Sequence, residues 1–153
     1  KFYTKSEIQP PDYIAGDSVV ERSIIGEGGE IHGEVYNSVI GPGVVIKKGS
    51  VVRDSIIMKQ SFIGENVTID KAIIAENVTV GNNVVMGVGE DVPNKEKPSV
   101  YSFGLVTIGE NSVIPADVKI GVNTAIVGET TPEDYPDGEL ASGETLNKEG
   151  ETA

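Results

Sequence analysis

The sequence predicts an all-β protein, built as a triangular stack of short parallel strands. Between residues 40 and 86, windows that begin with Ile or Val follow one another at spacings of six, six and five residues, and this pattern then repeats. The period is therefore 17 residues, and a fixed period indicates a stacked repeat architecture. Three windows in each period predict three straight sides in each coil.

Each window carries two side chains that we expect to point into the stack. The first position holds Ile40, Ile46, Val52, Ile57, Ile63, Ile69, Ile74 and Val80. The fifth position holds Val44, Ser50, Ile56, Ser61, Val67, Ile73, Val78 and Val84. The fourth is often Gly or Asn, as at Gly43, Gly49, Asn66, Asn77 and Asn83, and both types tolerate the left-handed backbone of a corner. The spacing does not fit an α-helix, whose apolar positions recur at three and four.

These windows are hexapeptide repeats, and the pattern resembles the left-handed parallel β-helix family. The resemblance implies about five to six coils stacked at roughly 4.8 Å, the spacing of paired strands. The left-handedness comes from the resemblance alone, because general principle favours right-handed crossovers between parallel strands.

Composition sets bounds on the function. The net charge of −12 argues against nucleic acid or an anionic membrane as a partner. The chain has no cysteine, which excludes thiolate metal sites and fits a cytoplasmic location. We find no apolar run of about 20 residues that could span a membrane and no signal peptide. The chain starts at Lys1 without a methionine, so we expect a piece of a longer protein.

Taken in order, the chain divides into three parts. Residues 1–17 contain Pro10-Pro11 and are predicted to form an extended connector or a loose linker. Residues 18–128 are predicted to form the β-helix. One step near His32 is 15 residues long, two fewer than the period. A polar loop at 87–105 interrupts the repeat, and it is either a binding loop or a tolerated insertion. Residues 129–153 are acidic and are predicted to be a disordered tail, with a short helix near Pro132-Glu133-Asp134 as the alternative.

Few residues are candidates for chemistry. His32 is the only histidine. It is either a solvated corner residue or the general base of a hexapeptide acyltransferase. Outward cations could form a weak anion patch or an ordinary solvated face: Lys47, Lys48, Arg53, Lys59 and Lys71. We predict no catalytic, cofactor-binding or metal-binding residue in this chain, because one His without Cys supplies no cluster of ligands.

The order of parts resembles the C-terminal β-helix of ADP-glucose pyrophosphorylase, also called glucose-1-phosphate adenylyltransferase. The resemblance rests on the Pro10-Pro11-Asp12 entry, the coils of Val-x-x-Ser-Ile-Ile type, and the Gly104-Leu105-Val106-Thr107 stretch followed by Ile114-Pro115. It implies a missing N-terminal nucleotidyltransferase domain that uses ATP and Mg²⁺ to make ADP-glucose for glycogen synthesis. The β-helix would then serve regulation and assembly, within a homo-oligomer that is a tetramer in the family.

Two departures from that family bear on regulation. Ser102 stands where plant-like members carry a lysine that binds a phosphorylated activator, and Ile73-Ile74-Ala75-Glu76 lacks the arginine of enteric members. Both changes remove a phosphate-binding cation, so activation by a sugar phosphate through these positions is in doubt. The alternatives are a hexapeptide-repeat acyltransferase, the C-terminal domain of another sugar-nucleotide pyrophosphorylase, the non-catalytic regulatory homologue, or a purely structural β-helix.

Several outward residues are apolar. We predict that Val45, Val51, Phe62 and Val85 form a subunit contact, the alternative being scattered surface residues of no consequence.

Overall fold

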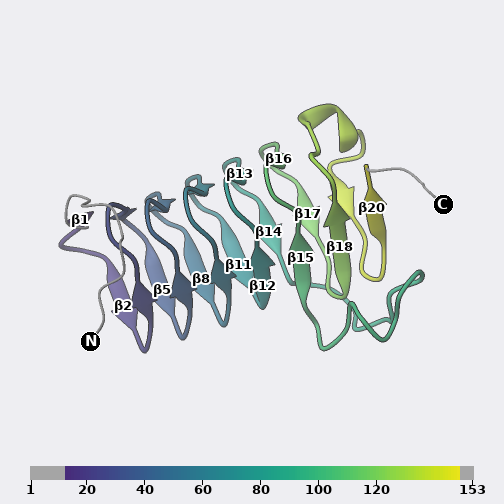
Figure 1. Ribbon diagram of the computed structural model, residues 1–153, viewed down its shortest axis with the longest axis horizontal. Coiled ribbons are helices and arrows are strands. Elements are labelled where there is room, and N and C mark those ends of the chain that lie inside the picture. The colour runs from purple at the N-terminus through teal and green to yellow at the C-terminus, as the bar shows by residue number, and fades with distance from the viewer. Residues whose placement is uncertain (1–12, 149–153) are drawn as a thin grey trace, which may run out of the picture.

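A computed structural model describes residues 13–148. The chain winds into a parallel β-helix whose axis is the long axis of the molecule, running from the N-terminal coil to the C-terminal coil (Figure 1). Every strand pair is parallel, and the strands form three sheets of six, seven and seven strands. The fold class predicted from the repeats is confirmed, and the stack is taller than the five to six coils expected.

The three sheets are the three sides of the prism. The first sheet contains β1 (Tyr13–Ile14), β4 (Glu30–Ile31), β7 (Val45–Ile46), β10 (Phe62–Ile63), β13 (Thr79–Val80) and β16 (Val113–Ile114). The second contains β2 (Val19–Glu21), β5 (Glu34–Tyr36), β8 (Val51–Arg53), β11 (Thr68–Asp70), β14 (Val85–Met86), β17 (Lys119–Ile120) and β19 (Glu139–Leu140). The third contains β3 (Ile24–Ile25), β6 (Val39–Ile40), β9 (Ile56–Ile57), β12 (Ala72–Ile74), β15 (Val106–Ile108), β18 (Thr124–Val127) and β20 (Thr145–Asn147).

The core is a column of aliphatic side chains along the axis. All eight first-position residues from Ile40 to Val80 are buried, as predicted. The pairing register places them one above another, as in Ile46, Ile63 and Val80. Corners use the left-handed backbone that Gly and Asn tolerate, with φ of 73° at Gly43 and 56° at Asn66. The sequence pattern therefore gives both the inward rows and the corners.

The prediction for the fifth position is wrong in the five-residue windows. Ile56 and Ile73 point outward, while Ser55 and Ala72 are buried in their place. A window that is one residue short brings its fourth residue inward, because side chains alternate across a strand. The serine is satisfied there: the Ser55 hydroxyl accepts from the Ala72 backbone N–H at 3.0 Å and donates to the Arg53 carbonyl at 2.7 Å.

The short step of 15 residues lies where the sequence places it. Only His32 and Gly33 separate β4 from β5, whereas four residues separate β7 from β8 in the next coil. A side chain at Gly33 would collide with the carbonyl oxygen of Ser50. Glycine is therefore required at this tightened corner.

The prediction of a disordered tail is wrong for residues 129–148. They form the 3₁₀ helix η1 (Pro132–Asp134) and strands β19 and β20, which pair with β17 and β18. The short helix weighed as the alternative is present. The sequence looked disordered because this segment has lost the hexapeptide spacing, yet Leu140 and Leu146 still pack against the core. Residues 1–12 of the predicted connector and residues 149–153 lie outside the described residues, and Tyr13–Ile14 belong to the first sheet as β1.

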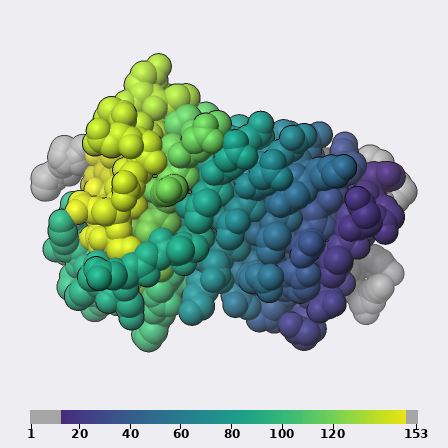
Figure 2. Space-filling model, turned by 180° about the vertical axis from the view of Figure 1, so that it is seen from behind, coloured from purple at the N-terminus to yellow at the C-terminus, as the bar shows by residue number. Residues whose placement is uncertain are grey.

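The C-terminal end is wider than the rest of the prism. The segment 87–105 leaves the stack between β14 and β15, and the segment around η1 projects on another side of the same end (Figures 1 and 2). No helix in residues 13–148 is long and apolar enough to cross a membrane.

Candidate functional site

The loop at residues 87–105 is fastened to the last coils by a buried asparagine. Asn94 is only 1% exposed. Its side-chain amide donates to the Asn123 carbonyl at 2.9 Å and to the Thr145 hydroxyl at 3.0 Å. Its Oδ1 accepts from the backbone N–H groups of Glu96 and Lys97, both at 2.9 Å. One side chain thus shapes the loop and joins it to β20.

A second asparagine holds the loop from the side of the β-helix. Asn123 has a φ of 56°, and its Oδ1 accepts from the Gly104 N–H at 2.8 Å. Its amide donates to Asp91 Oδ1 at 2.9 Å and to the Val92 carbonyl at 2.8 Å. An ion pair between Lys95 and Glu144 adds a contact at the surface. Both ends of the loop are therefore held by one residue.

Two hollows flank the loop. One, of about 380 Å³, lies between the start of the loop and the last coil, and it includes Glu90, Lys119, Glu139 and Ser142. The other, of about 370 Å³, lies at the corner beside Asp70, Lys71, Asp91 and Phe103. Phe103 is 86% exposed with a φ of 60°. An aromatic ring held outward beside a hollow can cover a bound molecule, and binding residues are often carried by loops on a rigid scaffold.

The charge of these hollows disfavours phosphate. Each hollow contains one lysine and two carboxylates: Lys119 with Glu90 and Glu139, and Lys71 with Asp70 and Asp91. A sugar phosphate needs a surplus of cationic donors. Ser102, at the position where a lysine would bind such an activator, is half-buried, and its carbonyl accepts from the Leu105 N–H at 3.2 Å.

His32 lies at the opposite end of the molecule. Its Nε2 is 3.2 Å from Glu30 Oε1, and its ring packs against Tyr13 with centroids 5.3 Å apart. The hollow beside it, about 220 Å³, includes the backbone around Ser50, but the Ser50 hydroxyl already bonds the Gly64 carbonyl and the Val67 N–H. The Ser50 hydroxyl is therefore already engaged, and the role of His32 stays a prediction.

The outward cations do not form one patch. Lys47 belongs to the first sheet, where its Nζ lies 6.0 Å from the Phe62 ring centroid. Arg53 belongs to the second sheet and stacks over Tyr36 at 4.6 Å. Lys59 and Lys71 flank the third sheet.

The predicted interface residues are divided in the same way, because Val45 pairs with Phe62 in the first sheet whereas Val51 and Val85 lie in the second. Within residues 13–148, no group of three or more His, Cys, Asp or Glu residues could hold a metal ion.

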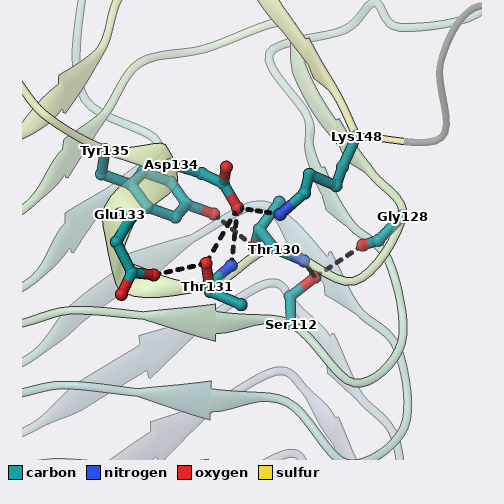
Figure 3. A network of polar contacts seen from close by, with 8 residues as sticks. All are labelled: Ser112, Gly128, Thr130, Thr131, Glu133, Asp134, Tyr135 and Lys148. Carbon is teal, nitrogen blue, oxygen red and sulfur yellow. Dashed lines mark hydrogen bonds and ion pairs between the residues drawn. The ribbon is translucent and has the colours of Figure 1, made fainter.

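The cap over the end of the first sheet is a polar network that the sequence reasoning missed (Figure 3). The Tyr135 ring is buried, and its hydroxyl forms a 2.8 Å hydrogen bond with Thr130 Oγ1. Asp134 Oδ2 accepts from the Thr131 backbone N–H at 2.7 Å and from Lys148 Nζ at 2.8 Å. The Thr131-Pro132-Glu133-Asp134 sequence is a helix-start signal with an acidic residue three positions after Thr, and it could have indicated this cap.

The cap shifts two ionisation equilibria. The hydrogen bond from Lys148, together with the backbone bond from Thr131, lowers the pKa of the Asp134 carboxyl. Burial raises the pKa of the Tyr135 hydroxyl to about 12. Lys148 follows β20 directly, so the ion pair with Asp134 ties the last strand to η1.

Comparison with known proteins identifies the family. Residues 12–108 match the model of the GlmU-like, C-terminal hexapeptide family. The chain belongs to this family. It is also 59% identical over 151 residues to the glucose-1-phosphate adenylyltransferase of Lachnospira eligens, and 43% identical over 152 residues to that of Acetivibrio thermocellus. Each alignment covers 99% of this chain and 36% of the relative, so the chain spans about a third of these proteins, in their C-terminal part. The resemblance to the C-terminal part of glucose-1-phosphate adenylyltransferase seen in the sequence is confirmed.

Among solved structures, the acetyltransferase domain of PglB from Neisseria gonorrhoeae FA1090 matches with a TM-score of 0.34 and 20% identity, over 86% of this chain and 55% of that one. A similarity of this size carries no argument about function.

Proposed function

We propose that this chain is the C-terminal β-helix of a glucose-1-phosphate adenylyltransferase. The observation that carries the proposal is the 59% identity to such an enzyme over nearly the whole chain. The full-length protein would join ATP and glucose 1-phosphate, with Mg²⁺, to give ADP-glucose and pyrophosphate in the cytoplasm for glycogen synthesis.

In this proposal the catalytic groups belong to a nucleotidyltransferase domain outside this chain. The β-helix contributes a rigid column whose strands are joined by backbone hydrogen bonds, such as Phe62 N–H to the Val78 carbonyl at 2.8 Å. A rigid column of this kind can hold other domains and subunits at fixed distances, which is the assembly role we assign to it. The homo-oligomer that the family resemblance implies is part of the proposal.

The regulatory role is assigned to the end that carries the loop. The loop is held by Asn94 and Asn123 over the last coils, and it places Phe103 beside the hollow at Lys71. Since each hollow has two carboxylates for one lysine, we propose that an effector bound here would be neutral or cationic rather than a sugar phosphate.

The test compares the full-length protein with the 153-residue chain in an assay of ADP-glucose formation from ATP and glucose 1-phosphate with Mg²⁺. We expect activity from the full-length protein and none from the isolated chain. ADP-glucose synthesis by the isolated chain would contradict the assignment of catalysis to another domain.

The same assay separates the alternatives. A full-length protein that uses a different nucleotide would be another sugar-nucleotide pyrophosphorylase, and one that is inactive with every nucleotide would be the non-catalytic homologue. Turnover of acetyl-CoA by the isolated chain that is lost in His32→Ala would instead support an acyltransferase. Each of these outcomes overturns the proposal.

A further inference from the structure

The third sheet carries an outward surface unlike those of the other two. Its outward row is apolar over four successive coils and consists of Ile24, Val39, Ile56 and Ile73. The second outward row, by the alternation of side chains, consists of Gly26, Gly41, Met58 and Ala75. We call these eight residues the apolar face. Ile24, Val39 and Ile56 are 68%, 44% and 42% exposed.

The other two sheets present charges at the matching positions. The first sheet has Glu30 and Lys47 on its outward surface, and the second has Glu34 and Arg53. The apolar face has no charged side chain at all over its four coils. A contiguous uncharged apolar strip on a charged molecule marks an interaction surface.

Charges occur only at the two corners that border the apolar face, and their signs are complementary. The corner row before the face is Arg22, Asn37, Asp54 and Lys71, and the corner row after it is Glu27, Pro42, Lys59 and Glu76. All eight residues except Pro42 and Asn37 are charged, and all eight are exposed. Along the stack the first row reads positive, neutral, negative, positive, and the second reads negative, neutral, positive, negative. The next coil, with Leu105 and Glu110 at its corners, ends the pattern.

We propose that the apolar face binds the apolar face of a second copy of this chain, with the two β-helices parallel and related by a two-fold axis along the stack. That symmetry keeps each coil at the height of the same coil in the partner and exchanges the two corners. Asp54 then faces Lys59 of the partner subunit, Arg22 faces Glu27 of the partner subunit, and Lys71 faces Glu76 of the partner subunit. Every charged corner over the four coils meets an opposite charge.

The antiparallel arrangement lacks this complementarity. A two-fold axis across the stack reverses the order of coils and keeps the corners, so that Arg22 would face Lys71 of the partner subunit and Glu27 would face Glu76 of the partner subunit. Like charges set opposite one another oppose association. The sign pattern therefore selects the parallel arrangement and makes the interface isologous.

The apolar face alone makes a small interface. Four coils at about 4.8 Å and a side of about five residues from corner to corner give roughly 300 Å² on each copy, against about 800 Å² on each partner in a standard interface. The isolated chain should therefore form a weak, concentration-dependent dimer. Residues of this chain alone form the interface, so its surface and symmetry are independent of the proposed enzymatic role.

The test is sedimentation velocity of the 153-residue chain over a concentration series that reaches the millimolar range, with single and double charge reversals. Asp54→Lys sets like charges opposite Lys59 of the partner subunit, and Lys59→Asp sets them opposite Asp54 of the partner subunit. Each should weaken the dimer by roughly tenfold, since the symmetry repeats the contact twice. The double variant Asp54→Lys/Lys59→Asp should restore it, and mixing the two single variants should give a heterodimer. Lysine is compatible with the left-handed backbone of Asp54, because Lys71 and Arg22 have the same conformation at equivalent corners.

Matched controls separate this from nonspecific effects. Ile56→Ser should abolish the dimer, whereas Phe62→Ser, at a similarly exposed position of the first sheet, should not. Asp54→Asn, which removes the charge and can still bond Asn37, should weaken the dimer less than Asp54→Lys. Circular dichroism checks that each variant is folded. A monomer at every concentration, a dimer that survives Ile56→Ser, or single reversals without rescue in the double variant would overturn the proposal, and none of these outcomes bears on ADP-glucose synthesis.

Discussion

From β5 to β14 each coil repeats the one before it at a step of 17 residues, whereas after Met86 each coil is closed by different contacts. In the regular part, one kind of interaction recurs: aliphatic side chains stack along the axis and corner serines bond the next coil, as Ser50 does with the Val67 N–H. In the C-terminal part, single side chains with unique partners hold the coils together. Asn94 and Asn123 each contact segments that the repeat would not bring together, and Tyr135 bonds Thr130 within the cap.

The difference follows from the physics of a stack. An interior coil is covered by a neighbour on both sides, so a repeated pattern satisfies it. A terminal coil has unpaired strand edges on one side, which a folded protein must cover. Here the segment that leads into η1 covers the end of the first sheet, since the Val113 N–H of β16 donates to the Thr130 carbonyl at 2.9 Å. Irregular structure with specific polar contacts is therefore concentrated where the repeat ends.

The largest effect is expected from a charge in the regular core. Ile63 is fully buried between Ile46 and Val80, and Ile63→Asp loses about 1.5–3 kcal/mol of burial and places a carboxylate in an apolar column at a further cost of several kcal/mol. Since small domains have only about 5–15 kcal/mol of stability, the isolated chain should unfold. Thermal unfolding followed by circular dichroism measures this. Phe62→Asp, the outward neighbour on the same strand, is the control and should stay folded; an unchanged Tm in Ile63→Asp would contradict the register.

A smaller, pH-dependent effect is expected at the cap. Burial raises the pKa of Tyr135 to about 12, from about 10 in the unfolded chain. Because the folded state favours the neutral hydroxyl, the pKa difference of Tyr135 contributes roughly 3 kcal/mol to the free energy of unfolding. This contribution is fully present below pH 10 and is lost as the pH rises toward 12. Urea unfolding at pH 9 and at pH 11.5 measures it. Tyr135→Phe should lose this component of the alkaline dependence, and a profile identical to that of the parent chain would show that Tyr135 is not its source.

How far the sequence predicts the structure depends on which of the two regions is considered. In the regular part, the Ile and Val windows identify the inward column correctly, and Gly33 accounts for the short corner. The error at Ile56 and Ile73 arises from the five-residue windows, where counting from the window start gives the wrong face. That error hides the apolar face, because it assigns Ile56 and Ile73 to the core, and the predicted interface residues all lie on the other two sheets.

In the C-terminal part, the sequence gives less. Leu140 and Leu146 complete the core, but they stand among Glu, Gly and Thr residues whose composition is typical of disorder. The contacts of Asn94 join residues about 30 and 50 positions apart. The 17-residue period does not predict these contacts. Only the Thr131–Asp134 helix-start signal was local enough to be read from the sequence.

The smallest effect is expected at the loop, and it tests whether the irregular region can be loosened without disturbing the regular coils. Asn94→Ala removes a buried amide that serves five partners and leaves the Glu96 and Lys97 N–H groups without their acceptor, which should cost about 1–3 kcal/mol. Because each coil contacts only its neighbouring coils, we expect the loss of stability to be local. Hydrogen exchange should increase within 87–105 and in β20, while β7 and β10 keep their protection.

Lys95→Ala is the matched control: it removes only the exposed ion pair with Glu144 and should change exchange little, because surface pairs contribute about 0–1 kcal/mol. Equal loosening of all coils in Asn94→Ala would mean that the loop is part of one cooperative unit with the regular stack, and the division between the two regions would then fail.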